Sequence, residues 1–215
     1  MMKTYLKIIT TALLLIFLYS CSGNDDEKEV EVVDIDPTEY IIAGKMLNNH
    51  LTIITFSSDN EVSIKNIDEE LFSTYTVSGD TLKIANYGFV KIQNNAIAYA
   101  EIDHMEFDDA LLLQTESVNV FKDKDFTGTL VNNQFQIPFF LRFSDSGILQ
   151  GTGQTFEDAN PDREFNVIGN VAGILEDNFS NIFYIHNNKL VYELKVDIGQ
   201  AGLNYFYNEG LDLQQ

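Results

Sequence analysis

Cysteine, tryptophan, proline and histidine are scarce in this chain. Its 215 residues include one cysteine, no tryptophan, three prolines and three histidines. With Cys21 as its single cysteine the chain cannot form an internal disulfide, so its stability must come from a hydrophobic core. The sequence has no Gly-x-Ser-x-Gly motif, and its three histidines are scattered, so nucleophilic catalysis finds no support. We therefore expect a protein without enzymatic activity.

Basic residues are also few. The chain has 13 lysines and arginines against 33 aspartates and glutamates, a formal net charge of −20. A surface of this sign repels nucleic acid and anionic membrane surfaces, so we expect no nucleic-acid partner. Hydrophobic residues make up 45% of the chain, which is too many for a disordered protein.

The first 21 residues have the order of a secretory signal. Lys3 and Lys7 precede the apolar run 8–18, which is too short to cross a bilayer. The run leads into the four residues Leu18, Tyr19, Ser20 and Cys21. These resemble the lipobox of bacterial lipoproteins, with Tyr19 where a small residue is usual. The resemblance implies that residues 1–20 are removed and that Cys21 carries the lipid. Removal takes away two lysines and no acid, leaving 11 basic and 33 acidic residues and a net charge of −22.

An acidic run follows directly after Cys21: Ser22, Gly23, Asn24, Asp25, Asp26 and Glu27. It resembles the surface-export tag of Bacteroidota lipoproteins, which implies lipid anchoring on the outer face of the outer membrane. The alternative is a solvated acidic linker without a targeting role. In either case we expect residues 21–39 to be a tether.

From Tyr40 onward, apolar residues recur with a period of two. β-branched and aromatic runs bounded by turn residues predict strands at 51–56, 74–77, 81–84, 89–92, 139–143 and 190–196. Residues 117–124 are the one place where we expect a short helical turn. The chain is therefore predicted to be all-β.

Asn-Asn pairs separate several of these runs, at 48–49, 94–95, 132–133 and 187–188. Asparagine tolerates positive φ, which a two-residue type I′ hairpin turn requires at both positions. We also expect a tight hairpin turn at 78–80. Four landmarks recur in the same order in both halves: a glycine-bearing strand, a strand ending in Phe-Ser, an Asn-Asn turn and a closing Leu-x-Leu strand. The repetition predicts a duplicated unit; the alternative is chance reuse of common turn residues.

The hairpin at 75–84, Tyr-Thr-Val-Ser-Gly-Asp-Thr-Leu-Lys-Ile, and the closing strand at 110–113 resemble small lipocalin-like domains of Bacteroidota lipoproteins. The second half resembles a broader calycin-type barrel. The resemblance implies an antiparallel up-and-down meander that forms two small lipocalin-like β-barrels, at 40–116 and 117–215. The alternative is one larger barrel or sandwich built from both halves. The chain departs from typical lipocalins at Gly44-Lys-Met46, where their Gly-x-Trp motif would stand.

Metal-binding patterns are sparse. Asp158, Asn160 and Asp162 have the 1, 3, 5 spacing of oxygen ligands in a calcium loop, but the Gly and Glu of an EF-hand are missing at the later positions. The alternative is an Asx turn. His104 and Glu106 lie on one face of a predicted strand, and two ligands do not make a metal site. We expect no cofactor, with calcium as the open possibility.

Three functional hypotheses follow. The first is a non-catalytic, lipid-anchored cell-envelope protein that binds a small ligand or an envelope protein. The second is an accessory subunit of an outer-membrane transport or assembly complex. The third is a hydrolase of glycans or lipids, which would need two carboxylates facing each other across a cleft. Fold alone does not choose among them.

Overall fold

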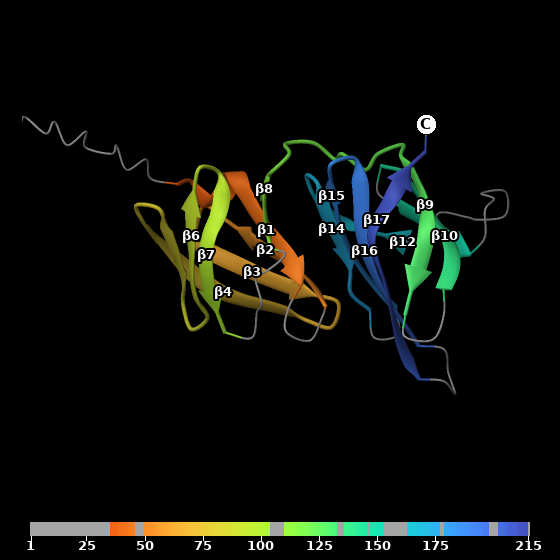
Figure 1. Ribbon diagram of the computed structural model, residues 1–215, viewed down its shortest axis with the longest axis horizontal. Coiled ribbons are helices and arrows are strands. Elements are labelled where there is room, and N and C mark those ends of the chain that lie inside the picture. Colours follow the sequence, from red (N-terminus) through yellow and green to blue (C-terminus); the bar gives the residue numbers. More distant parts are fainter. Residues whose placement is uncertain are drawn as a thin grey trace, which may run out of the picture. The chain divides into compact units, whose positions relative to one another are not determined.

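The computed structural model describes residues 35–45, 50–103, 110–132, 136–145, 147–152, 163–176, 179–197 and 202–214. This part of the chain forms seventeen strands and one three-residue 3-10 helix, η1 (Pro37–Glu39). All strand pairs are antiparallel, so the predicted all-β fold is confirmed (Figure 1). Residues 117–124 form bends and turns, so the predicted helical turn is wrong. Among the described residues, no helix is long and apolar enough to span a bilayer.

The first half of the chain forms an eight-stranded sheet that is nearly closed into a barrel. Its strands are β1 (Tyr40–Lys45), β2 (Leu51–Phe56), β3 (Glu61–Asn66), β4 (Glu70–Ser78), β5 (Thr81–Ile84), β6 (Gly88–Gln93), β7 (Ala96–Ile102) and β8 (Leu111–Gln114). β1 to β7 form a simple meander, and β8 returns to pair with β1. Each strand from β1 to β6 therefore pairs with the next one in sequence, as expected for an up-and-down barrel.

The second half forms a nine-stranded sheet. Its strands are β9 (Asp125–Val131), β10 (Gln136–Phe143), β11 (Gly147–Thr152), β12 (Arg163–Glu164), β13 (Asn166–Ile168), β14 (Val171–Ile174), β15 (Phe179–His186), β16 (Lys189–Asp197) and β17 (Leu203–Leu213). The order is β12-β11-β10-β9-β17-β16-β15-β14-β13, which places β12 and β13 at the two edges. Only Phe165 separates these two strands in the chain, so the backbone itself joins the two edges of the sheet. With β12 and β13 counted as one strand bent at Phe165, this sheet is also an eight-stranded up-and-down meander.

The two halves therefore share one topology. Within the described residues, no strand of the first sheet pairs with a strand of the second, so the two halves do not form one larger barrel. The expected boundary at residues 116 and 117 falls between β8 and β9. The repeat landmarks also match. The glycine-bearing strands are β1 and β9, the Phe-Ser sequences stand at the ends of β2 and β10, and the closing strands β8 and β17 pair with β1 and β9.

Asparagine turns close the equivalent hairpins of both sheets. Asn94 and Asn95 connect β6 to β7, and Asn187 and Asn188 connect β15 to β16. All four have positive φ, between 52° and 60°, as the predicted type I′ turns require. Gly79 has a φ of 60° in the predicted hairpin turn between β4 and β5. The other two Asn-Asn pairs include residues outside the described part.

Each barrel is filled by side chains of a different kind. The first holds mainly aliphatic residues: Ile42, Ile54, Val62, Ile64, Tyr75, Leu82, Ile84, Val90, Ile92 and Ile102. The second is rich in aromatic rings: Phe121, Phe126, Phe139, Phe143, Phe165, Phe183, Tyr192 and Phe206. Alternation along the strands directs these side chains inward. Such filling is typical of small barrels whose interior is a core and not a ligand cavity.

A third hydrophobic cluster contains residues of both halves. Ile41, Ala43, Leu51, Ile53, Ile67 and Leu113 come from the first, and Val171, Ile182, Tyr184 and Val191 come from the second. We call it the shared core. It buries outward-facing side chains of β1 and β2 against β14, β15 and β16, so apolar surface that a lone barrel would expose is removed from water.

Candidate functional site

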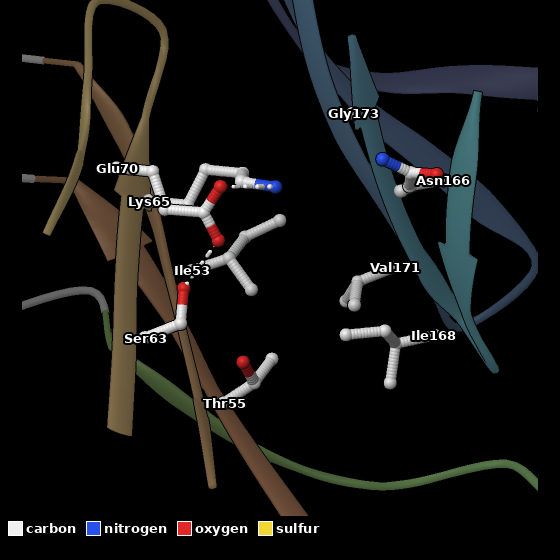
Figure 2. Close-up of a pocket in the computed structure, with 10 residues that line it drawn as sticks. Ile53, Thr55, Ser63, Lys65, Glu70, Asn166, Ile168, Val171 and Gly173 are labelled. Carbon is white, nitrogen blue, oxygen red and sulfur yellow. Dashed lines mark hydrogen bonds and ion pairs between the residues drawn. The ribbon is translucent and has the colours of Figure 1, made fainter. Parts of the chain in front are cut away.

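A groove runs beside the shared core, with one wall from each half of the chain. We call it the β3–β14 groove. It is a small groove with a cavity volume of about 50 Å³, and it is open to solvent. Figure 2 shows the two walls facing each other across this space. Its lining residues are Ile53, Thr55, Ser63, Lys65, Glu70, Asn166, Ile168, Val171, Ala172 and Gly173.

Strand register explains why the first wall has these side chains. Lys65 of β3 lies opposite both Ile53 of β2 and Glu70 of β4, so the three form one cross-strand row. Ser63 lies opposite Thr55 and Phe72 in a second row. Because successive side chains of a strand point to opposite faces, both rows lie on the outer face of the barrel. The register therefore continues the groove wall to Phe72, whose exposed fraction is 72%.

The second wall is short and mostly apolar. Val171 is buried in the shared core, whereas Ile168 of β13 is 50% exposed. Gly173 leaves room for the first wall: a Cβ atom there would lie 3.1 Å from the Asn181 carbonyl oxygen and 3.7 Å from Lys65 Cδ. A larger residue at this position would press on the lysine side chain and narrow the groove.

Three polar side chains of the groove, Ser63, Lys65 and Glu70, are paired with each other. Lys65 Nζ lies 3.0 Å from one carboxylate oxygen of Glu70, and the Ser63 hydroxyl donates to the other at 2.7 Å. Both oxygens of Glu70 therefore have partners. The arrangement provides an apolar floor at Ile53 and Val171 beside a polar wall, which is suited to binding a partly apolar group.

A polar cluster lies at the other end of β2. It consists of His50, Asp68, Glu193, Lys195 and Tyr205. Glu193 of β16 is only 2% exposed, and its two oxygens accept hydrogen bonds from His50 Nδ1 at 2.5 Å and from the Leu51 backbone N–H at 2.6 Å. On the other side of the imidazole, His50 Nε2 lies 3.8 Å from Asp68. Asp68 also accepts a hydrogen bond from the Tyr205 hydroxyl at 3.0 Å and pairs with Lys195 Nζ at 3.0 Å.

These contacts change the acidity of two groups. The hydrogen bond to Glu193 raises the pKa of His50 above its usual 6.5, and partial burial opposes this only in part. Burial, followed by the hydrogen bond to Asp68, raises the pKa of Tyr205 to about 12. The Tyr205 ring also contacts the imidazole, with a centroid separation of 4.6 Å. Around neutral pH the phenol therefore remains a hydrogen-bond donor.

The residues singled out from sequence fall mostly outside the described part of the chain. Outside it lie the lipobox residues Leu18, Tyr19 and Ser20, the lipidation candidate Cys21, and the export-tag residues Ser22 to Glu27. The calcium candidates Asp158, Asn160 and Asp162 and the pair His104 and Glu106 are outside it as well. Within the described part, no group of three or more His, Cys, Asp or Glu side chains is placed to hold a metal ion.

Sequence reasoning missed the polar cluster. An isolated histidine beside an Asn-Asn pair, such as His50, shows no partner in the sequence. In the segment Tyr205-Phe206-Tyr207, Phe206 is buried, and both tyrosines are half-buried against the shared core. The three consecutive aromatic residues were the signal in the sequence for this contact. A strand with aromatic side chains on both faces buries both of them when a second layer covers it.

Comparison of the chain with protein-family models, with curated proteins and with solved structures finds no match.

Proposed function

We propose that this chain is a non-catalytic, lipid-anchored protein of the outer membrane that binds a partner protein of the envelope at the β3–β14 groove. The anchoring part of the proposal rests on the resemblance of residues 18–27 to a lipobox and a surface-export tag. The binding part rests on the contrast between the packed interiors of the barrels and the groove on their outer faces.

One observation carries the binding part: the barrel interiors are packed with side chains, while the groove and its exposed apolar residues lie on the outside. Phe121, Phe143 and Phe183 pack with ring centroids 5.2 to 5.3 Å apart inside the second barrel. Ten buried side chains occupy the first barrel. An internal small-molecule site would have to displace these side chains, whereas a partner at the groove displaces only water.

Exposed apolar side chains beside the groove favour a protein partner. Phe72 is 72% exposed and Ile168 is 50% exposed. Protein interfaces are enriched in aromatic side chains, and a few of these carry most of the binding energy. A partner that places an apolar side chain on the groove floor would bury Phe72 and Ile168 as well.

Site-directed photo-crosslinking in cells that express the full chain tests this proposal. A photoreactive phenylalanine analogue replaces Phe72 in one strain and Tyr99 in another. Tyr99 is a matched control, because it is also aromatic and exposed (53%) but lies on β7, away from the groove lining. We expect a discrete cross-linked protein from position 72 and none from position 99, and we expect Ile168→Asp to abolish it. Equal labelling from both positions, or none from position 72, would contradict the proposal.

Two other hypotheses have different outcomes in the same experiment. If the cross-linked protein is an integral outer-membrane protein, the chain is an accessory subunit of a transport or assembly complex. A small molecule that is released from the full chain on denaturation and detected by native mass spectrometry would favour ligand binding. The hydrolase hypothesis gains no support at this groove, because Glu70 is the only carboxylate among the described residues that line it and both of its oxygens are paired.

A further inference from the structure

Glu193 is the most deeply buried acidic side chain of the polar cluster, and its partners come from the other half of the chain. It belongs to β16, whereas His50 and Leu51 lie at the start of β2, more than 140 positions earlier. Both of its oxygens are satisfied only while these two halves stay together. Opening the contact would leave a carboxylate and a backbone N–H without these partners, and burial makes such a loss costly.

The charge balance of the cluster depends on His50. Glu193 and Asp68 bring two negative charges and Lys195 brings one positive charge. Tyr205 of β17 faces the imidazole as a neutral phenol. When both ring nitrogens carry a proton, His50 is positively charged, and the cluster then has two positive and two negative charges. Without that proton the cluster has an excess negative charge, and the carboxylates of Glu193 and Asp68 lie on either side of a neutral ring.

We propose that the polar cluster is a proton-operated latch between the two β-barrels, closed when His50 is protonated and weakened when His50 loses its proton. This inference does not rest on the proposed function, because it concerns how the two halves are held together and not what they bind.

Linkage gives the direction of the effect. The closed arrangement raises the pKa of His50, chiefly through the hydrogen bond to Glu193, so the closed state binds the proton more tightly than the open state does. The stabilisation is therefore fully present below the ordinary histidine pKa of 6.5 and is lost as the pH rises through the raised pKa of the closed state. Lys195 opposes the rise, and Glu193 and Asp68 support it.

β2 connects the latch to the shared core and the groove. Its first residue, Leu51, donates its N–H to Glu193 and buries its side chain in the shared core. Two positions later, Ile53 belongs to the shared core and also lines the groove floor. Loosening of the latch would therefore act on a strand that forms one wall of the groove.

Histidine titration by NMR on the full chain provides the first test. The resonance of His50 is assigned with His50→Gln, and the other two histidines serve as internal references. We expect His50 to titrate above 6.5 and Glu193→Gln to lower its midpoint. An unchanged midpoint in Glu193→Gln would overturn the proposal. If that variant does not fold, Asp68→Asn is used instead, because the Asp68 side chain is 38% exposed. The titration midpoint of His50 must also fall in this variant.

Amide hydrogen exchange provides the second test, because the Leu51 N–H reports directly on the latch. We expect its protection factor to fall as the pH rises through the His50 midpoint, because the closed state then loses the proton that stabilises it. The control is the Ile92 N–H, which donates to the Asp80 carbonyl at 2.8 Å within the first barrel. His50→Gln must remove the pH dependence at Leu51. Parallel changes at Leu51 and Ile92 would show general loosening of the fold and would overturn the latch.

Discussion

Gly44 of β1 lies so close to Ala110, just before β8, that a Cβ atom on Gly44 would be 2.9 Å from the Ala110 Cα atom. The second barrel repeats this relationship: a Cβ atom on Gly128 of β9 would be 2.6 Å from the side chain of Leu211 on β17. In both barrels the first strand thus lacks a side chain where the last strand returns to it. The glycines of the repeated sequence are explained by this close approach.

Replacing Gly44 with alanine should destabilise the first barrel. The new methyl group meets backbone atoms of Ala110, which cannot rotate away, so we expect a loss of about 1–3 kcal/mol in the free energy of unfolding. Gly210→Ala is the matched control, because its nearest atoms belong to the flexible Lys189 side chain and the change should stay within about 0.5 kcal/mol. Denaturant unfolding of both variants measures the difference. Equal losses would mean that the β1–β8 contact is not tight.

Phe121 should be among the most costly residues to truncate, although it lies in a connecting turn. Its side chain is fully buried and contacts the rings of Phe143, Phe165 and Phe183. Phe121→Ala is expected to lower the free energy of unfolding by about 3–5 kcal/mol, because it leaves a cavity. Val118→Ala, three residues earlier and 65% exposed, should change it by less than about 0.5 kcal/mol. Thermal unfolding distinguishes the two, and a small effect at Phe121 would mean that the aromatic core can close over the cavity.

A buried hydrogen bond inside the second barrel lends itself to a double-mutant cycle. The Tyr192 hydroxyl donates to Asn181 Oδ1, and both side chains are fully buried. Asn181 Nδ2 has no hydrogen-bond partner among the described residues. Tyr192→Phe should cost about 1–3 kcal/mol, because it leaves the amide oxygen unsatisfied. Adding Asn181→Leu should recover most of this loss in the unfolding free energy, since position 181 then has no amide group left without a partner. Additive losses would argue against coupling of the two side chains.

Tyr205 should lose its phenolic proton at a higher pH than an ordinary tyrosine. Its pKa is raised to about 12, so the folded state retains the phenolic proton more tightly than the unfolded chain does. Its contribution to stability is present below a pH of about 10 and is lost as the pH rises toward 12. The ultraviolet difference spectrum of tyrosinate follows this transition. Tyr205→Phe should remove the component near 12, and Asp68→Asn should move it to lower pH. A titration curve that is identical in Tyr205→Phe would refute the assignment.

Local patterns in the sequence predicted the strands and turns well. The runs at 51–56 and 81–84 coincide with β2 and β5, and four asparagines adopt the positive φ that their turns require. These features depend on residues near each other in the chain, because side-chain alternation and turn geometry are local properties. The repeated landmarks likewise appear at matching places in both barrels, since each one marks a turn or a strand.

The sequence by itself thus determined an all-β chain of two similar meanders. Only the tertiary structure decided how the second sheet bends at Phe165 so that the chain joins its own edges. It also decided that His50, Leu51 and Glu193 meet across more than 140 positions, and that the tyrosines beside Phe206 are half-buried. These contacts join strands of different barrels. No periodicity within one strand specifies its partner in another layer, because that choice depends on how the outer faces fit together and on which buried charges find a partner.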